Sequence, residues 1–500
     1  MTTDATRPSG LSTQRLLVTC FTALVATSFG FVLRAMVIDD WGREFALTET
    51  QKGELLGVGL WPFAISIVLF SLVIDRIGYR TAMWFAFACH VVSVIATVTA
   101  QDYWSLYLGT FIVALGNGAV EAAVNPAIVS ACPDDKTRML NRLHAGWPGG
   151  LVLGGLLVLT LGPEVGWRIK IALILLPTLL YGALLVKQQF PVSERVAAGV
   201  PWNVMLAEVG ALGALIFSAL TVAELGRVFE WSIGLQLALI AAMTLAYGFA
   251  ARSAGRPLFL LLVLMMIPLA TTELGTDSWI TDLMGPQMQK LGLAPGWILV
   301  WTSLLMMLLR IFAGPFVHKL SPLGLLAAGA AIAAFGLALL SHAAGLAILA
   351  AATVYGIGKA FLWPTMLGVV AERFPRGGAM TLNTVAAVGM LSVGIVGAVF
   401  LGRMQDGSIS HAVQRHDAEQ GTTLARDYLT DEQQSVLGKY RALDAGKVDA
   451  ASPGDKAVLD QLRAQAKQGA LRTIAVLPAG LAVGFFLLAL VTRRRGGAAA

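Results

Sequence analysis

The sequence predicts an all-α membrane protein that crosses the bilayer many times. Of its 500 residues, 56% are hydrophobic and 13% are charged, whereas soluble domains are roughly 45–50% apolar and about 25% charged. The hydrophobic residues gather in runs of about 20, the length that a membrane-spanning helix needs. We expect fourteen spans, arranged as two six-helix bundles with an extra two-helix hairpin between them, or twelve spans if the hairpin does not cross.

The N-terminal half predicts one six-helix bundle over residues 14–188, preceded by a polar cytoplasmic tail at 1–13. Very short polar breaks separate its apolar runs, so each run is expected to be one span. The expected spans are 14–38, 51–74, 80–100, 103–131, 138–162 and 166–187.

The C-terminal half predicts a second bundle over residues 257–402 and 472–492. Residues 403–471 are the one long polar stretch, and we expect an extracytoplasmic, mainly helical loop there. Residues 493–500 are expected to be a cytoplasmic tail. The expected spans of this half are 257–284, 296–318, 322–341, 344–370, 378–402 and 472–492.

A linker at 189–256 joins the two halves and contains two further apolar runs within 204–251. Arginines flank these runs on both sides, which favours a transmembrane hairpin. The first run is interrupted by Glu208, Glu224 and Arg227. An amphipathic linker lying on the cytoplasmic surface is therefore the alternative.

The basic residues lie mainly in loops that follow even-numbered spans and in the C-terminal "RRR" at 493–495. The positive-inside rule then places these loops and both termini in the cytoplasm, and we expect a multi-pass protein of the inner membrane. This distribution accounts for the net charge of +6 without a nucleic-acid partner. We expect the chain to act as a monomer in the lipid bilayer.

The sequence gives no sign of an enzyme. It has no P-loop, no His-Glu-x-x-His motif, no nucleophile elbow and no soluble domain that could hold a cofactor. Its three cysteines, Cys20, Cys89 and Cys132, show neither metal-ligand spacing nor an evident disulfide pairing. We expect no metal and no cofactor.

The stretch "LGNGAVEAAVNPAIV", from Leu115 to Val129, places a carboxylate inside an apolar run. An unpaired charge at that depth costs at least about 2.5–3.5 kcal/mol, so such groups usually face a cavity or a partner. Asn117, Glu121 and Asn125 recur at helical spacing and predict one polar stripe. Burial favours the neutral carboxylic acid, so Glu121 could take up and release a proton. The alternative is a permanent structural pair with His144, Arg142 or an asparagine.

Two loops resemble a signature of the major facilitator superfamily. "SLVIDRIGYR", from Ser71 to Arg80, resembles the family's Gly-x-x-x-Asp-Arg-x-Gly-Arg-Arg loop, with Ser71 in the place of Gly and Tyr79 where Arg is common. "RIFAGPFVHKLSP", from Arg310 to Pro322, holds the corresponding place in the second half. The resemblance implies two pseudo-symmetric bundles with a site between them, and gating roles for Asp75, Arg76, Arg80 and Arg310.

Within that superfamily, four motifs resemble the fucose and glucose proton symporter group. They are "GNGAVEAAVNP" at 116–126, "LNRLHAGWPGG" at 140–150, "TTELGTDSW" at 271–279 and "GKAFLWPTM" at 358–366. The resemblance implies a proton-coupled sugar carrier in which Glu121 binds the proton. His144 titrates near neutrality and could share that proton.

The chain departs from the group's pattern at three positions. Arg34 stands where the group has Asp on the first span, Lys359 where it has Asn, and His144 where it has Gln. Two extra cations would suit an anionic substrate. Alternatively, Arg34 could snorkel outward and pair with Asp39, and Lys359 could pair with Glu273 or Asp277.

We therefore expect a secondary transporter that imports a sugar or polyol with protons by alternating access. Import of a small organic anion is the alternative, followed by export and, outside transport, by a membrane sensor. Trp147 could stack on a sugar ring, or simply pack between helices. The candidate substrate contacts are Asn117, Asn125, Asn141, Trp147, Glu273, Asp277, Trp279, Lys359, Trp363 and Arg34.

Overall fold

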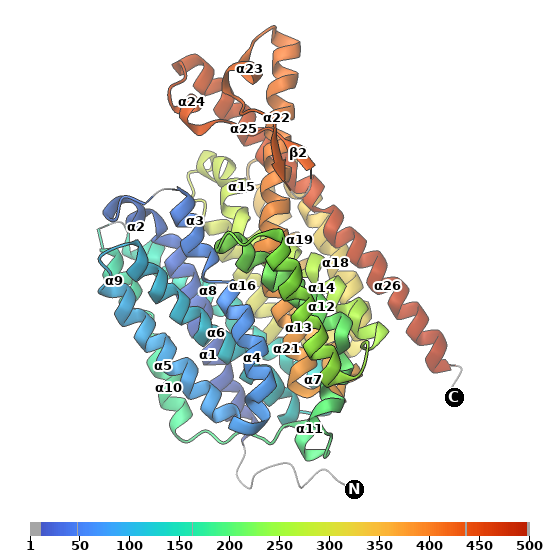
Figure 1. Ribbon diagram of the computed structural model, residues 1–500. Helices are drawn as coiled ribbons and strands as arrows, with labels where there is room; N and C mark the ends of the chain where they lie inside the picture. The colour runs from blue at the N-terminus through green and yellow to red at the C-terminus, as the bar shows by residue number, and fades with distance from the viewer. Residues whose placement is uncertain (1–11, 48, 163, 436–437, 498–500) are drawn as a thin grey trace.

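The computed structural model describes residues 12–47, 49–162, 164–435 and 438–497, and its first half is a helical bundle (Figure 1). Several predicted spans consist of two helices with a break between them, as at Ala145 and at Leu173–Ile174. The helices of this half are α1 (Thr13–Met36), α2 (Ile38–Glu44), α3 (Glu49–Gly57), α4 (Trp61–Ile77), α5 (Tyr79–Val98), α6 (Tyr103–Ala131), α7 (Lys136–His144), α8 (Gly146–Leu161), α9 (Trp167–Ala172) and α10 (Leu175–Val186).

The second half is built in the same way, with two short π-helical segments, η1 and η3, in its spans. Its elements up to the polar cap are α14 (Pro257–Ala270), η1 (Thr271–Gly275), α15 (Thr276–Lys290), α16 (Trp297–Ile311), α17 (Gly314–Lys319), α18 (Pro322–Leu340), α19 (Ala347–Lys359), α20 (Leu362–Arg373), the 3-10 turn η2 (Pro375–Gly377), α21 (Gly378–Ser392) and η3 (Val393–Gly397).

The prediction of an all-α, many-span membrane fold is confirmed. Among the described residues, thirteen helical segments are at least 18 residues long and apolar enough to cross a membrane. The predicted span at 296–318 contains the apolar helix α16, which has 15 residues. Helices suit a bilayer because all their backbone polar groups are satisfied within the segment. Many large apolar side chains are exposed on the outside, as at Trp104 and Phe249.

Small residues bring neighbouring helices into close contact within the first half. A Cβ atom added to Gly118 of α6 would lie 2.4 Å from the backbone oxygen of Phe63 in α4. A Cβ atom added to Gly150 of α8 would lie 2.4 Å from the oxygen of Val25 in α1. These distances leave no room for a side chain, which explains the glycines at helix crossings.

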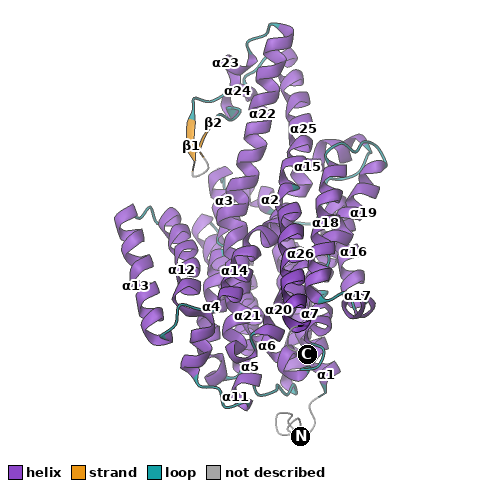
Figure 2. Cartoon of the chain, turned by 90° about the vertical axis from the view of Figure 1, so that its right-hand side faces the viewer, coloured by secondary structure: helices purple, strands orange, loops and turns teal. Residues whose placement is uncertain are grey.

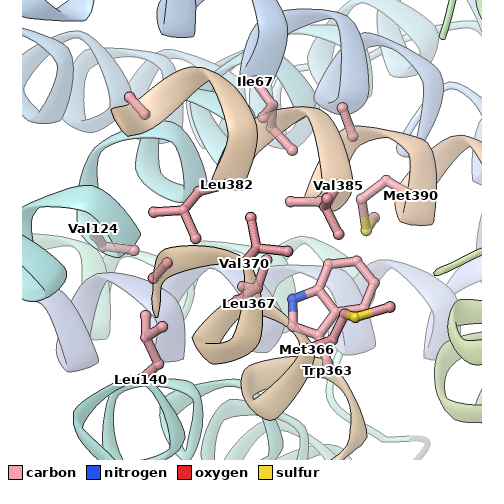
Figure 3. Close-up of a cluster of buried hydrophobic side chains, with 14 of the residues drawn as sticks. Ile67, Val124, Leu140, Trp363, Met366, Leu367, Val370, Leu382, Val385 and Met390 are labelled. Carbon is pink, nitrogen blue, oxygen red and sulfur yellow. The ribbon is translucent and has the colours of Figure 1, made fainter. Parts of the chain in front are cut away.

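The two halves meet along a dry apolar seam (Figure 3). Side chains of α4, α6 and α7 from the first half face side chains of α20 and α21 from the second. All of them are buried. The seam residues labelled in the figure are Ile67, Val124, Leu140, Trp363, Met366, Leu367, Val370, Leu382, Val385 and Met390.

The linker forms a short helix, α11 (Glu194–Ala197), and then a pair of long helices, α12 (Trp202–Val228) and α13 (Ile233–Ala251). α12 packs beside α21, whereas α13 lies on the outside of α12 (Figure 2). Both are long and apolar enough to span a membrane. Glu208 and Glu224, which interrupt the first apolar run, are paired with Arg256 and Arg227.

The polar stretch at 403–471 forms a cap at the end of the molecule opposite to α11 (Figure 1). A small apolar core formed by Ile409, Val413, Leu424, Leu459 and Ala466 holds it together. Two short antiparallel strands, which the sequence did not predict, complete it. The elements from here to the C-terminus are α22 (Ala398–Gln420), α23 (Leu424–Tyr428), β1 (Gln433–Ser435), β2 (Gly438–Tyr440), α24 (Ala445–Asp449), α25 (Pro453–Ile474) and α26 (Val476–Gly497).

Candidate functional site

Glu121 lies in the middle of α6, close to the seam, and forms a buried cluster with Asn125 and His144. The Glu121 Oε1 atom accepts a hydrogen bond of 2.9 Å from Asn125 Nδ2. The Asn125 Oδ1 atom lies 2.8 Å from His144 Nε2, which is itself 3.8 Å from Glu121 Oε1. No lysine or arginine among the described residues forms an ion pair with Glu121. Its protonation state is therefore not fixed by a cation.

Trp363, in the first turn of α20, connects this cluster to the second half. Its side chain lies near Glu121, and its backbone N–H donates a bond of 2.9 Å to Glu273 Oε2. The helix at this point is interrupted, because α19 ends at Lys359 and α20 begins at Leu362. The carboxylate of Glu273 satisfies one of the free N–H groups that every helix start leaves.

Glu273 and Arg310 form a buried ion pair in the second half, with Arg310 Nη2 2.6 Å from Glu273 Oε1. Arg310 also donates to two backbone oxygens, Ala360 O at 2.5 Å and His144 O at 3.0 Å. Glu273 lies in the π-helical segment η1, and such segments occur frequently at functional sites. Arg310 thus lies at the meeting point of the halves, next to His144, instead of in the loop that follows α16.

A second buried ion pair joins Lys359 to Asp277, which is one of the alternatives left open for Lys359. The ammonium group also lies 5.1 Å from the centre of the Tyr355 ring. Buried charges are tolerated when they are paired in this way. The Oδ2 atom of Asp277 has no hydrogen-bond partner among the described residues.

Of three other predicted contacts, Asn141 lies where the two halves meet. Asn141 donates to Thr137 O at 2.9 Å and to Thr365 Oγ1 of the second half at 3.2 Å. Trp147 is half-buried, with its ring centre 6.1 Å from that of Phe31. The side chain of Trp279 lies outside the described part of the structure.

Two predicted contacts have partners inside the first bundle, so the expected polar stripe joins Glu121 and Asn125 but does not extend to Asn117. Asn117 accepts a 2.9 Å hydrogen bond at Oδ1 with His90 Nε2 of α5, inside the first bundle. Arg34 donates to Ser93 Oγ of the same helix at 2.8 Å. The pairing of Arg34 with Asp39 does not occur, because Asp39 pairs with Lys52. Successive residues four apart drift around the helix, so Asn117 faces α5 while Asn125 faces α7.

Sequence reasoning missed the partners of this inner cluster. His90 contacts both Asn117 and the Tyr181 hydroxyl, the latter at 2.9 Å from His90 Nδ1. A histidine inside the apolar run 80–100 was the available signal, since such a group needs buried partners.

Charged residues at the α11 end of the molecule join several helix ends. Asp75 forms an ion pair of 2.5 Å with Arg195, and Lys136 one of 2.7 Å with Glu194. Thr137 donates to Glu372 across the two halves at 2.5 Å. Arg80 donates to Val186 O at 3.0 Å, whereas Arg76 is exposed. The linker residues Glu194 and Arg195 were not among the predicted gating residues.

Two helical bundles that meet along an apolar seam next to buried polar residues, with an apolar outer surface, are typical of a membrane transporter. The comparison with protein families agrees: the Major Facilitator Superfamily model matches residues 16–398. The chain belongs to the Major Facilitator Superfamily.

Curated relatives match only in part. A probable sugar efflux transporter of Pasteurella multocida is 26% identical over 141 residues, which are 28% of this chain and 35% of that protein. The cis,cis-muconate transport protein of Acinetobacter baylyi is 24% identical over 161 residues, or 32% and 39% of the two chains. The chain thus aligns with well under half the length of these relatives.

Solved structures with the same fold include sugar and anion transporters. The proton:xylose symporter XylE, bound to 6-bromo-6-deoxy-D-glucose, has a TM-score of 0.58 at 15% identity, covering 81% of this chain and 90% of its own. The human organic anion transporter MFSD10 has a TM-score of 0.59 at 13% identity, and the match covers 96% of this chain and 100% of that chain. The Escherichia coli fucose:proton symporter FucP has a TM-score of 0.54 at 13% identity, and the match covers 93% of this chain and 98% of that chain. These likenesses show the fold, and the family model confirms the predicted superfamily.

Proposed function

We propose that the protein is a secondary active transporter of the inner membrane that imports a neutral sugar or polyol together with a proton bound at Glu121. The observation that carries this proposal is the buried position of Glu121 beside the seam, without a lysine or arginine partner among the described residues. In this proposal both termini lie in the cytoplasm, as the positive-inside rule predicts.

The charges at the interface support a neutral substrate. Arg310 and Lys359 are each matched by a carboxylate, Glu273 and Asp277. Protonation of Glu121 therefore leaves this region without net charge, which is the state that moves most easily through a low-dielectric interior. An anionic substrate would need a cation that is free to bind it.

Proton coupling supplies enough energy for accumulation. One proton that moves inward along a potential of 100 mV releases about 2.3 kcal/mol, which corresponds to a concentration ratio of about 50 for a neutral solute. Tight coupling requires that substrate and proton each raise the affinity of the other. The position of Glu121 suits such coupling because it lies close to His144 of the first bundle and Trp363 of the second.

The test uses the purified protein in proteoliposomes with a panel of labelled sugars, polyols and sugar acids, with and without an imposed pH gradient. Glu121→Gln keeps the shape of the protonated acid. It should exchange labelled substrate at a rate near that of the wild type, but should not accumulate it against a gradient. Glu224→Gln is the matched control, because Glu224 is also a buried carboxylate in a long helix but pairs with Arg227. If Glu121→Gln still accumulates substrate, the proton site lies elsewhere.

A small organic anion is the second candidate substrate, and one observation favours it. Arg34 is 5% exposed and has no carboxylate partner among the described residues, so a substrate carboxylate could neutralise it. The same panel tests this candidate. It is supported over the first if the wild type takes up sugar acids but not neutral sugars, and if Arg34→Gln loses the uptake of sugar acids.

A further inference from the structure

Three prolines in the helices around the interface leave backbone oxygens without their usual partner. In an α-helix the carbonyl of residue i accepts from the N–H of residue i+4, and proline has no N–H. Pro126, Pro148 and Pro364 therefore free the carbonyl oxygens of Ala122, His144 and Ala360. A buried carbonyl without a partner costs about 1–3 kcal/mol.

Side chains of the second half satisfy all three oxygens. Asn383 Nδ2 of α21 donates to Ala122 O at 3.1 Å. Arg310 Nη1 donates to His144 O at 3.0 Å, and its Nε atom donates to Ala360 O at 2.5 Å. The first two bonds cross from one half to the other. Both donors are almost completely buried, so water does not compete with them in this arrangement.

These two crossing bonds hold the proton site from both sides. Ala122 directly follows Glu121 in α6, and His144 is the residue that contacts Asn125. The donors belong to the other bundle. Any movement of one bundle against the other must therefore break the Asn383 and Arg310 bonds next to the groups that bind the proton.

We propose that Asn383 and Arg310 are positioning residues that hold the two bundles together at the proton site through carbonyls freed by Pro126 and Pro148. The contact is reversible because a freed carbonyl can bind water when the interface opens, without loss of any helical hydrogen bond. An ordinary helical carbonyl already accepts one hydrogen bond from its own N–H, so a donor from the other half gains less there than at a freed carbonyl. The inference rests on the proposed transport function for its meaning, but its test does not require transport.

The test measures how often the seam opens. In a variant whose Cys20, Cys89 and Cys132 are replaced by alanine, Val370→Cys places one thiol in the buried seam shown in Figure 3. Pro126→Ala and Pro148→Ala restore an N–H to each helix, which then competes with Asn383 or Arg310 for the carbonyl. Loss of one hydrogen bond worth about 0.5–1.5 kcal/mol should raise the rate of thiol labelling roughly 2- to 10-fold.

Pro268→Ala is the matched control. Pro268 lies inside α14, and among the described side chains none donates to the oxygen of Leu264 that it frees. This variant should be labelled at the rate of the parent. The proposal would be overturned if Pro126→Ala and Pro148→Ala were labelled no faster than Pro268→Ala, whether or not that common rate equals the rate of the parent.

A double-variant cycle separates this role from a general loss of stability. Once Pro126→Ala has supplied an N–H to Ala122 O, Asn383→Ala should add little to the labelling rate, although Asn383→Ala alone should raise it. Independent, additive effects would contradict the proposal. Glu121→Gln distinguishes the two hypotheses: if it still accumulates substrate, the proposed function fails while these labelling results stand.

Discussion

At the scale of single residues, Glu121 and His144 have different environments although both belong to one buried cluster. Among the described residues, the side chain that donates a hydrogen bond to the Glu121 carboxylate is the neutral amide of Asn125. His144 places one ring nitrogen 2.8 Å from Asn125 Oδ1, so it can orient the amide that donates to Glu121. This geometry favours Glu121 as the proton carrier and His144 as the residue that positions it.

His144→Gln should therefore retain proton-driven accumulation, at most severalfold reduced, because a neutral amide can also donate to Asn125 Oδ1. His144→Leu should lose it, since it leaves a buried acceptor without a partner at a cost of about 1–3 kcal/mol. Uptake in proteoliposomes over a range of pH values measures both. Loss of accumulation in His144→Gln would mean that the imidazole itself carries the proton.

At the scale of elements, the break between α19 and α20 depends on an ion pair from two other segments. Arg310 donates to Ala360 O before the break, and Glu273 accepts from Trp363 N after it. The two charges also neutralise each other. Removal of one of them leaves a buried charge and a free backbone group at the same time.

Arg310→Gln and Glu273→Gln should each lower the melting temperature of the purified protein clearly, because breaking a buried pair costs about 3–5 kcal/mol. The double variant should be less destabilised than the sum of the two single variants, since neither charge is then left alone. Thermal unfolding in detergent measures the cycle. Additive losses would show that the pair does not act as a unit.

The hairpin α12–α13 is predicted to cross the membrane, with Glu230 at its outer turn. Glu230 is exposed, with a positive φ of 54°. A cysteine at this position, in a background without the native cysteines, should react with an impermeant thiol reagent in intact cells. Ala198→Cys, exposed next to α11, should react only after permeabilisation. Labelling of both only after permeabilisation would favour twelve spans.

At the scale of the whole molecule, the linker helix α11 connects the helix ends at one side. Glu194 binds Lys136 at the start of α7, and Arg195 binds Asp75 at the end of α4. Charge pairs at such a junction can form in one state of a transporter and break in the other. The linker therefore takes part in the contacts that alternating access must rearrange.

Asp75→Asn should slow substrate exchange about tenfold or more, while the equilibrium affinity for substrate changes less than about threefold, because Asp75 lies far from the Glu121 cluster in sequence and at the α11 end. The double variant Asp75→Arg with Arg195→Asp should restore part of the rate by reforming the pair. Lys187→Gln, an exposed change nearby, is the control. A comparable fall in affinity would place Asp75 at the substrate site instead.

The sequence by itself determined the membrane fold and most of the spans, and it indicated Glu121 as a candidate site residue. Apolar runs of about 20 residues specify helices because lipid offers the backbone no other partner, and a carboxylate in such a run needs a special environment. Both signals are local, so they can be read from the order of the residues.

Only the tertiary structure decided which polar side chains meet. Asn117 and Asn125 are eight residues apart on one helix, yet Asn117 contacts His90 and Asn125 contacts His144. Lys359 pairs with Asp277, and Arg310 reaches Glu273 and the His144 carbonyl. These partners are 19 to 166 positions apart in sequence. Their contacts depend on the rotation and packing of whole helices, which hydrophobic runs do not specify.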